Sequence, residues 1–233
     1  MILFYTNNIT DNLAILEGDE AMHCTKTLRK KIGDTIYFVD GKGGMYDGKI
    51  IGSNKKSCSI VIENSHFTEK RKDYKVHLAI APTKNINRLE WFLEKATEIG
   101  IDVITPIICQ RSERKKIRLD RLTKVVAAAM KQSVKPHLPL MNDLMKFKDF
   151  IQEDFDGQKL IAHCNEGEKT ALKHIYQPQN DVLIMIGPEG DFSNEEVAWS
   201  LKNGFSPISL GAERLRTETA GLASVHTISL INQ

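Results

Sequence analysis

Clustered cysteines are missing from this chain, although it contains four cysteines. Cys24, Cys58, Cys109 and Cys164 are far apart and form no CxxC or CxxH pair. Structural zinc sites need ligands at such close spacings, so the sequence predicts no metal site. Unpaired, scattered cysteines are also typical of proteins whose thiols stay reduced.

Long hydrophobic runs are missing as well. The start, MILFYTNN, has no basic region followed by a long apolar core, and no later run approaches transmembrane length. We therefore expect a cytoplasmic protein that neither spans nor binds a membrane.

A strong excess of one charge is absent too. The 32 Lys and Arg residues nearly balance 30 Asp and Glu residues, which leaves a net charge of +2. That total does not identify a nucleic-acid-binding protein, so local basic clusters carry more information. A length of 233 residues with 41% hydrophobic content predicts one large or two small globular domains.

Familiar catalytic patterns are not found. The chain has no Ser-His-Asp order, no HExxH, no P-loop and no GxGxxG. Its glycine-rich segment at residues 41–44 has no following helix pattern, so we interpret it as a turn.

The first domain is predicted to span residues 1–72 and to be rich in β-structure. Strand-forming runs at Ile36–Asp40 and Ser57–Glu63 surround the dipeptides Asp40-Gly41 and Asp47-Gly48, which favour hairpin turns. Glu20–Leu28 has helical spacing. Arg29 and Lys30 follow it and would lie on the rim of a small barrel, either as a solvated face or as a nucleic-acid contact.

The charged segment Lys70–Asp73 is the expected linker, and residues 73–233 alternate between strands and helices. Expected strands are Tyr74–Pro82, Asp102–Cys109, Lys159–Cys164, Asp181–Gly187 and Pro207–Leu210. Expected helices are Asn85–Gly100, Leu119–Ser133, Asn142–Gln152, Glu168–Tyr176, Asn194–Asn203 and Thr217–Leu230. This alternation predicts an open, parallel α/β sheet with helices on both faces.

Two polar, glycine-containing segments follow consecutive strands near the end of the chain. In IGPEGDFSNEE (186–196), Pro188 stiffens the loop between Gly187 and Gly190, and Ser193 with Glu196 forms a capping box. In LGAERLRTETA (210–220), charged residues precede the last helix. Ligands of α/β proteins bind beyond the carboxyl ends of strands, so loops on neighbouring strands would lie side by side and form a nucleotide-sized crevice.

Apolar and basic residues complete this predicted site. Ile186, Leu210 and Leu215 could pack on an adenosine-like ring, and Glu189 stands at the tip of the stiff loop. A basic segment at residues 111–124 begins beyond an expected strand. It is either a solvated helix start or a tract that binds phosphates, and its first members are Arg111, Arg114, Lys115 and Lys116.

Three segments together resemble one family. EKATEIGIDVITPIICQRS (94–112), IGPEGDFSNEE (186–196) and LGAERLRTETA (210–220) are similar to the SPOUT-class 16S ribosomal RNA uridine-N3 methyltransferases of the RsmE type. The segment 28–44 resembles that family's N-terminal PUA-like β-barrel. The chain departs from the usual pattern at Asp191, where glycine is common, and at Glu213-Arg214, where Arg-Ile is common.

The resemblance implies a C-terminal SPOUT α/β domain with a deep trefoil knot, S-adenosylmethionine as cofactor, a homodimer, and methylation of a uridine in 16S rRNA of the small ribosomal subunit. Arg216, Glu189 and Glu218 are the candidate catalytic residues. The candidate cofactor-binding residues are His163, Ile186, Gly187, Pro188, Glu189, Gly190, Ser209, Leu210, Gly211, Leu215, Thr217, Thr219 and Ala220. His163, at the end of an expected strand, could instead be structural, which is the safer interpretation. Two alternatives are a non-catalytic RNA-binding factor on the same fold and a methyltransferase with another RNA target.

Overall fold

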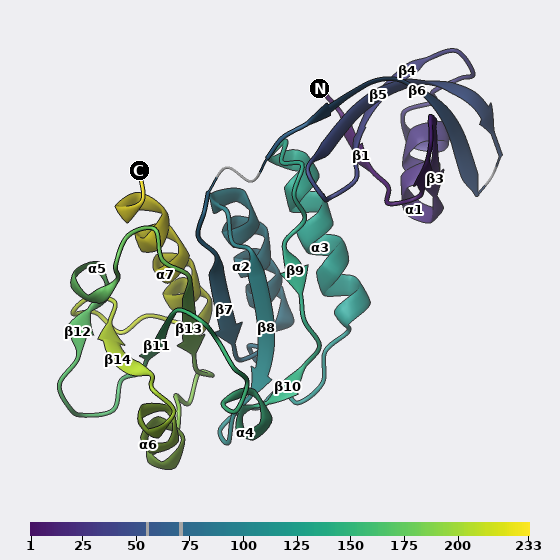
Figure 1. Ribbon diagram of the computed structural model, residues 1–233. Coiled ribbons are helices and arrows are strands. Elements are labelled where there is room, and N and C mark those ends of the chain that lie inside the picture. The colour runs from purple at the N-terminus through teal and green to yellow at the C-terminus, as the bar shows by residue number, and fades with distance from the viewer. Residues whose placement is uncertain (55, 70–71) are drawn as a thin grey trace. The chain divides into compact units, whose positions relative to one another are not determined.

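The computed structural model describes residues 1–54, 56–69 and 72–233, and the chain divides into two compact units (Figure 1). Met1–Arg71 and Ala127–Leu138 form the first unit, whereas Lys72–Val126 and Pro139–Gln233 form the second. Of the expected linker, Lys70 and Arg71 lie outside the described residues. Lys72 belongs to the second unit, where its ammonium group pairs with Asp102.

The first unit contains a six-stranded sheet in the order β1-β4-β5-β6-β3-β2. The pair β1–β4 is parallel and the remaining pairs are antiparallel. Its strands are β1 (Leu3–Tyr5), β2 (Ile9–Thr10), β3 (Leu13–Glu17), β4 (Thr35–Val39), β5 (Gly44–Ser53) and β6 (Ser57–Phe67). Phe4, Leu16, Phe38 and Ile60 are fully buried at its core.

Two local predictions for the first unit need correction. Asp47-Gly48 is not a hairpin turn but lies inside β5, at a shift in its register with β6. A Cβ atom on Gly48 would lie 2.4 Å from the Val61 carbonyl oxygen, so glycine is needed for β5 and β6 to approach this closely. The expected helix at Glu20–Leu28 is a short α1 (Gly18–Met22) that continues as the π-helix η1 (His23–Thr27).

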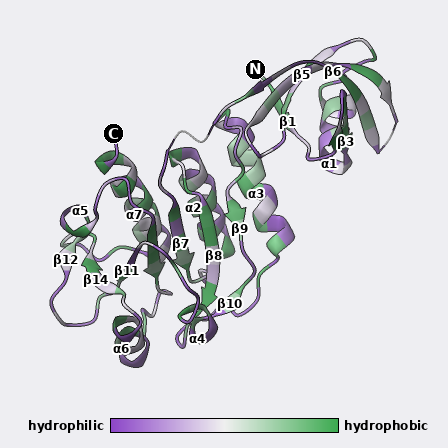
Figure 2. Cartoon of the chain, in the orientation of Figure 1, coloured by the Kyte–Doolittle hydropathy of each residue, from purple (hydrophilic) through white to green (hydrophobic). Residues whose placement is uncertain are grey.

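The second unit is built on a parallel sheet in the order β10-β8-β7-β13-β11-β14-β12, with β9 paired to β8. Its strands are β7 (Val76–Ile80), β8 (Val103–Ile108), β9 (Leu140–Met141), β10 (Met145–Lys146), β11 (Gln158–Ala162), β12 (Thr170–Ala171), β13 (Val182–Ile186) and β14 (Ser206–Ser209). Figure 2 shows hydrophobic residues along β7 and β8.

Helices cover both faces of this sheet, as the uninterrupted apolar strand at 182–186 predicts. On one face, Leu183 and Met185 of β13 pack with Phe147 of α4 (Phe147–Phe150). On the other face, α7 (Thr217–Ile231) packs against α2 (Ile86–Ile99) and β7. A Cβ atom on Gly221 would lie 2.8 Å from the Phe92 ring, so a small residue is needed where α7 crosses α2.

Most helix boundaries agree with the sequence. Asn85 caps α2 by accepting from the Asn87 amide, and Gly100 ends it at φ 127°. The others include α3 (Leu119–Gln132) and α6 (Asn194–Lys202), which begins at the expected Ser193–Glu196 capping box. None of the described helices has both the length and the apolar character needed to cross a membrane.

Two helix predictions in the second unit were wrong in extent. Asn142 does not cap a helix, because its amide donates to Thr105 and α4 begins only at Phe147. The expected helix at Glu168–Tyr176 is reduced to α5 (Leu172–Ile175), since Thr170 and Ala171 pair with β14 instead.

The strand order changes how the two glycine segments meet. Strands β13 and β14 are not neighbours, because β11 lies between them and pairs with both. All three strands are parallel, so their carboxyl ends lie at one edge of the sheet. Three loops, rather than two, therefore converge there.

Candidate active site

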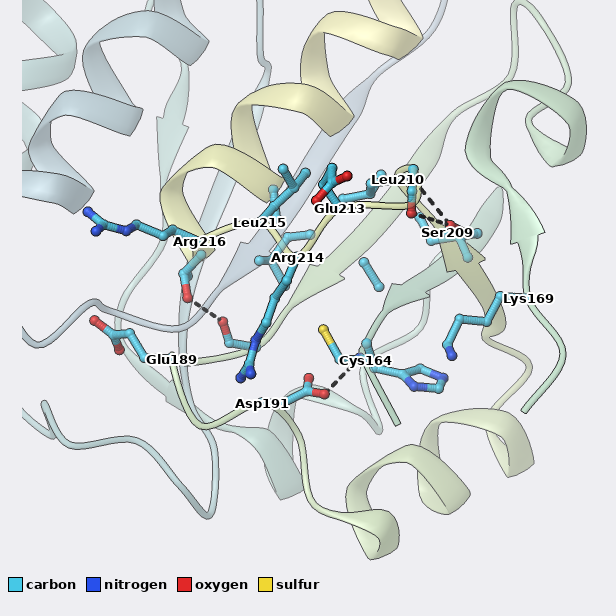
Figure 3. A pocket seen from close by; sticks show the side chains of 18 of the residues that line it. Cys164, Lys169, Glu189, Asp191, Ser209, Leu210, Glu213, Arg214, Leu215 and Arg216 are labelled. Atoms are coloured by element: carbon cyan, nitrogen blue, oxygen red, sulfur yellow. Dashed lines mark hydrogen bonds between the residues drawn. The ribbon is translucent and has the colours of Figure 1, made fainter. Parts of the chain in front are cut away.

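A pocket of about 620 Å³ lies at the carboxyl ends of β11, β13 and β14 (Figure 3). The loop after each strand supplies part of its wall. It is lined by Ala162, His163, Cys164, Lys169, Ile186, Gly187, Pro188, Glu189, Asp191, Ile208, Ser209, Leu210, Gly211, Ala212, Glu213, Arg214, Leu215, Arg216, Thr217 and Ala220. This volume is in the usual range for pockets that bind small molecules.

The loop after β13 has a conformation that its sequence explains. A Cβ atom on Gly187 would lie 3.0 Å from the Phe192 ring, so glycine allows the loop to fold over that buried ring. The Asp191 amide donates to the Pro188 carbonyl at 2.8 Å and closes a tight turn. At the end of the loop, the Glu196 carboxylate accepts from Ser193 N at 2.9 Å and from Gln110 N at 2.7 Å.

The loop after β11 contributes residues that sequence analysis missed. Cys164 is exposed and its amide donates to Asp191, while the Lys169 ammonium donates to the Asn165 carbonyl. Burial, and then the nearby Lys169, lowers the pKa of His163 below its ordinary value, so this pocket-lining imidazole favours the neutral form. The sequence pattern of a strand followed by a polar, glycine-containing segment also occurs at β11. The same pattern identified the loops after β13 and β14, so it could have predicted Cys164 and Lys169 as site residues.

Glu189 stands at the edge of the pocket and is half-buried. One of its carboxylate oxygens accepts from the Lys84 amide at 2.9 Å, which fixes the side chain against the segment before α2. Among the described residues the second oxygen has no hydrogen-bond donor, so it can accept a bond from a ligand.

Two arginines of the segment after β14 are exposed and line the pocket. Within the part of the chain that the structure describes, the guanidinium groups of Arg214 and Arg216 form no ion pair or hydrogen bond. Figure 3 shows Arg214 extending toward Asp191, and Arg216 extending on the side of Glu189. These two cations are therefore free to bind a ligand.

Three predicted site residues lie outside the pocket lining. Gly190 and Thr219 are exposed beside it, whereas Glu218 is buried in the first turn of α7. One oxygen of Glu218 lies 3.8 Å from Nε of Arg88 on α2. Glu218 thus faces α2 rather than the pocket.

The predicted RNA-binding residues fall into different environments. The Arg111 guanidinium donates to the carbonyl oxygens of Gly190 at 2.9 Å and Phe192 at 3.4 Å. Arg114 donates to the carbonyl oxygens of Thr83 at 2.9 Å and Lys84 at 2.6 Å. Both arginines therefore hold loops around the site.

The other predicted RNA-binding side chains are less constrained. Lys115 and Lys116 are exposed beyond β8, in the second unit. In the first unit, Arg29 is exposed and has a left-handed backbone with φ 52°, and Lys30 is half-buried. No cluster of three or more potential metal ligands occurs within residues 1–54, 56–69 and 72–233.

Comparisons with known proteins agree with this arrangement. Residues 70–229 match the family described as the RNA methyltransferase domain, and residues 16–63 match the RNA methyltransferase PUA domain. A Rickettsia conorii protein named ribosomal RNA small subunit methyltransferase E is 29% identical, over 98% of this chain and 95% of its own length.

Two solved structures are similar to nearly the whole chain. A "probable rRNA-methyltransferase" from Porphyromonas gingivalis is 38% identical, with a TM-score of 0.88 and 99% of both chains covered. The ribosomal RNA small subunit methyltransferase E of Neisseria gonorrhoeae, solved with bound S-adenosyl methionine, is 25% identical. Its TM-score is 0.87, and the match covers 100% of this chain and 98% of that one.

Proposed function

Because the chain belongs to the RNA methyltransferase domain family, we propose that it uses S-adenosylmethionine to methylate N3 of a uridine in small-subunit ribosomal RNA. The names of its relatives support small-subunit ribosomal RNA as the substrate. The resemblance of residues 210–220 to the uridine-N3 methyltransferases supports N3 as the methylated atom. One observation carries the proposal: the pocket at the ends of β11, β13 and β14 has a free arginine, Arg216, at its edge.

The residues of the pocket fit this cofactor. Ile186, Ile208 and Leu215 offer apolar surface to an adenine ring, and the loop backbones at residues 187–189 and 209–212 offer amides and carbonyls. Charged groups of both signs, among them Lys169 and Glu213, suit the amino and carboxylate groups of a methionyl chain. When bound, S-adenosylmethionine supplies a methyl group activated by its sulfonium.

Arg216 is the proposed catalytic cation. Uridine N3 carries a proton and becomes nucleophilic only when that proton leaves, which places negative charge on the uracil oxygens. An exposed guanidinium with no protein partner in the described chain can donate to O2 or O4 and stabilise that charge.

Glu189 is the proposed acceptor of the N3 proton. Its fixed position at the pocket edge leaves one carboxylate oxygen available, and Figure 3 places it on the same side as Arg216. Glu218 is the proposed positioning residue for the first turn of α7, since it faces Arg88.

The rest of the molecule has proposed roles in presenting RNA. Residues 1–72 would form a PUA-like β-barrel that contacts RNA through Arg29 and Lys30, while Lys115 and Lys116 would contact phosphates beside the pocket of the 73–233 domain. N3 lies on the pairing edge of the base, so the target uridine must be unpaired or turned out. We also propose a trefoil-knotted SPOUT domain, a homodimer and a cytoplasmic location, where this RNA occurs.

The test is to incubate the purified protein with S-adenosylmethionine and small ribosomal subunits that lack the modification. Mass spectrometry of nuclease fragments then locates the methyl group. A single 3-methyluridine supports the proposal. A methyl group on a ribose oxygen or on another base would contradict it, and cofactor binding without any methylation would favour a non-catalytic RNA-binding factor.

A further inference from the structure

Asp191 has an unusual backbone for a residue with a side chain. Its φ is 61°, in the left-handed region where glycine is most easily accommodated. Its carboxylate explains why a side chain is useful there. One oxygen accepts from the Cys164 amide at 2.7 Å, and the other accepts from the Phe192 amide at 2.8 Å. Both oxygens of the carboxylate are therefore engaged by backbone donors.

These hydrogen bonds join two separate loops of the pocket. Cys164 belongs to the loop after β11, whereas Asp191 belongs to the loop after β13, and both residues line the pocket (Figure 3). The same loop after β13 is also held by Arg111, which donates to the carbonyl oxygens of Gly190 and Phe192. Asn165 of the loop after β11 also donates to the Phe192 carbonyl oxygen, at 3.4 Å, so Asp191 makes the shorter of these hydrogen bonds between the two loops.

We propose that Asp191 is a positioning residue that holds these loops in the ligand-ready form before the cofactor arrives. The identity of the ligand rests on the proposed function, but the loop contact does not. A pocket that is already formed binds more tightly, because none of the binding free energy is used to order its walls. When the competent form is only a fraction of the population, the apparent affinity falls by that fraction.

Direct electrostatic attraction between Asp191 and the sulfonium is the rival explanation, and the two make different predictions. S-adenosylhomocysteine, the product after methyl transfer, has no charge on its sulfur. A positioning role predicts that loss of Asp191 weakens both ligands by the same factor. A direct contact predicts weaker binding of S-adenosylmethionine alone.

Two substitutions separate the backbone from the carboxylate. Asp191→Gly permits the left-handed φ and removes both acceptor oxygens. Asp191→Asn also tolerates this φ and retains one acceptor oxygen. We expect about tenfold or greater loss of affinity for both ligands in Asp191→Gly, and an intermediate loss in Asp191→Asn, because hydrogen bonds to charged groups are among the stronger ones.

Asp181 provides a matched control. Its carboxylate also accepts a backbone amide from a distant segment, that of Lys75 at 2.7 Å, but it precedes β13 and lies at the opposite edge of the sheet. Asp181→Gly removes a comparable contact without touching the pocket. It is expected to lower the melting temperature and to leave both affinities within about twofold of wild type.

Hydrogen exchange in the free protein tests the loop contact without any ligand. In Asp191→Gly, the amides of Cys164 and Phe192 are expected to exchange at least about tenfold faster than in the wild type. In Asp181→Gly, the same two amides are expected to exchange at the wild-type rate. Unchanged exchange in Asp191→Gly would overturn the inference, whatever the cofactor proves to be.

Calorimetric titration with S-adenosylmethionine and S-adenosylhomocysteine tests the consequence, at a temperature where all variants are folded. A positioning role is supported if each variant loses the same factor of affinity for both ligands, and if the loss is larger in Asp191→Gly than in Asp191→Asn. Wild-type affinity in Asp191→Gly, or a loss confined to S-adenosylmethionine, would overturn it. If the wild-type protein binds neither ligand, the proposed function fails, and the exchange rates still decide the role of Asp191.

Discussion

The hydroxyl of Thr217 donates a hydrogen bond of 3.1 Å to the carbonyl oxygen of Gly187. Thr217 begins α7 and Gly187, thirty residues earlier, directly follows β13, and both are buried. The bond connects the segment after β14 to the loop after β13 across the intervening β11. It therefore joins the two glycine-containing segments recognised in the sequence.

Removing this hydroxyl is expected to destabilise the protein and weaken cofactor binding. Thr217→Val keeps the shape of the side chain but leaves the buried Gly187 carbonyl without its donor, at a cost of about 1–3 kcal/mol. Urea unfolding measures the loss, and Thr217→Ser, which keeps the hydroxyl, serves as the control. Equal stabilities for the two variants would show that this bond contributes nothing.

Substitution of Arg216 is expected to affect turnover more than cofactor affinity. Arg216→Ala removes the proposed donor to the uracil oxygens, and loss of one such donor typically lowers kcat by about 10²–10³-fold. Methyl incorporation under saturating S-adenosylmethionine measures the change. Lys202→Ala removes another exposed cation, at the end of α6, and is expected to retain wild-type turnover. Undiminished turnover in Arg216→Ala would remove this residue from the mechanism.

Residues of the basic segment after β8 are expected to serve two functions: Lys115 and Lys116 bind RNA, whereas Arg111 positions a loop of the pocket. A Lys115→Ala, Lys116→Ala double variant removes two exposed cations, so it should weaken RNA binding and reduce its salt dependence by about one unit of slope per lost phosphate contact. Its affinity for S-adenosylmethionine should not change. Filter binding at several salt concentrations and calorimetry measure the two effects.

Arg111→Ala should show the opposite pattern. Its guanidinium holds the loop after β13 through two carbonyl oxygens, so its loss is expected to reduce cofactor affinity first. If Arg111→Ala weakens RNA binding by the same mechanism as the lysine pair, with a lower salt slope and normal cofactor affinity, its role is to bind phosphate instead.

Stability is expected to fall in mild acid because of His77. Burial lowers the pKa of this histidine to about 4, and its Nε2 lies 2.7 Å from the Thr105 hydroxyl oxygen. In the unfolded chain the pKa is about 6.5, so the unfolded state binds more protons between these values. The contribution is therefore fully present above about pH 6.5 and is lost as the pH falls toward 4, by up to about 3 kcal/mol.

Denaturant unfolding of wild type and His77→Gln from pH 4 to pH 7 measures this contribution. The variant has no titrating group at this position, so its stability should change less over the range. Parallel pH profiles for the two proteins would assign the acid sensitivity to other groups.

Local patterns in the sequence determined much of this protein by themselves. The apolar strand at 182–186, the caps at Asn85 and Ser193, and the polar segments after two strands are encoded by neighbours along the chain, since periodicity, capping and turn chemistry act over a few residues. They sufficed to predict an α/β sheet and the carboxyl-end location of the pocket, and they mark the segments that resemble the RNA methyltransferases.

Contacts between distant groups depend on the tertiary structure. Strand order places β11 between β13 and β14, and so brings Cys164 and Lys169 into the pocket and connects Asp191 to the Cys164 amide. It also turns Glu218 toward α2 and engages Arg111 with loop carbonyls. Pairing of strands far apart in the chain depends on the packing of the whole sheet, which no local pattern of residues specifies.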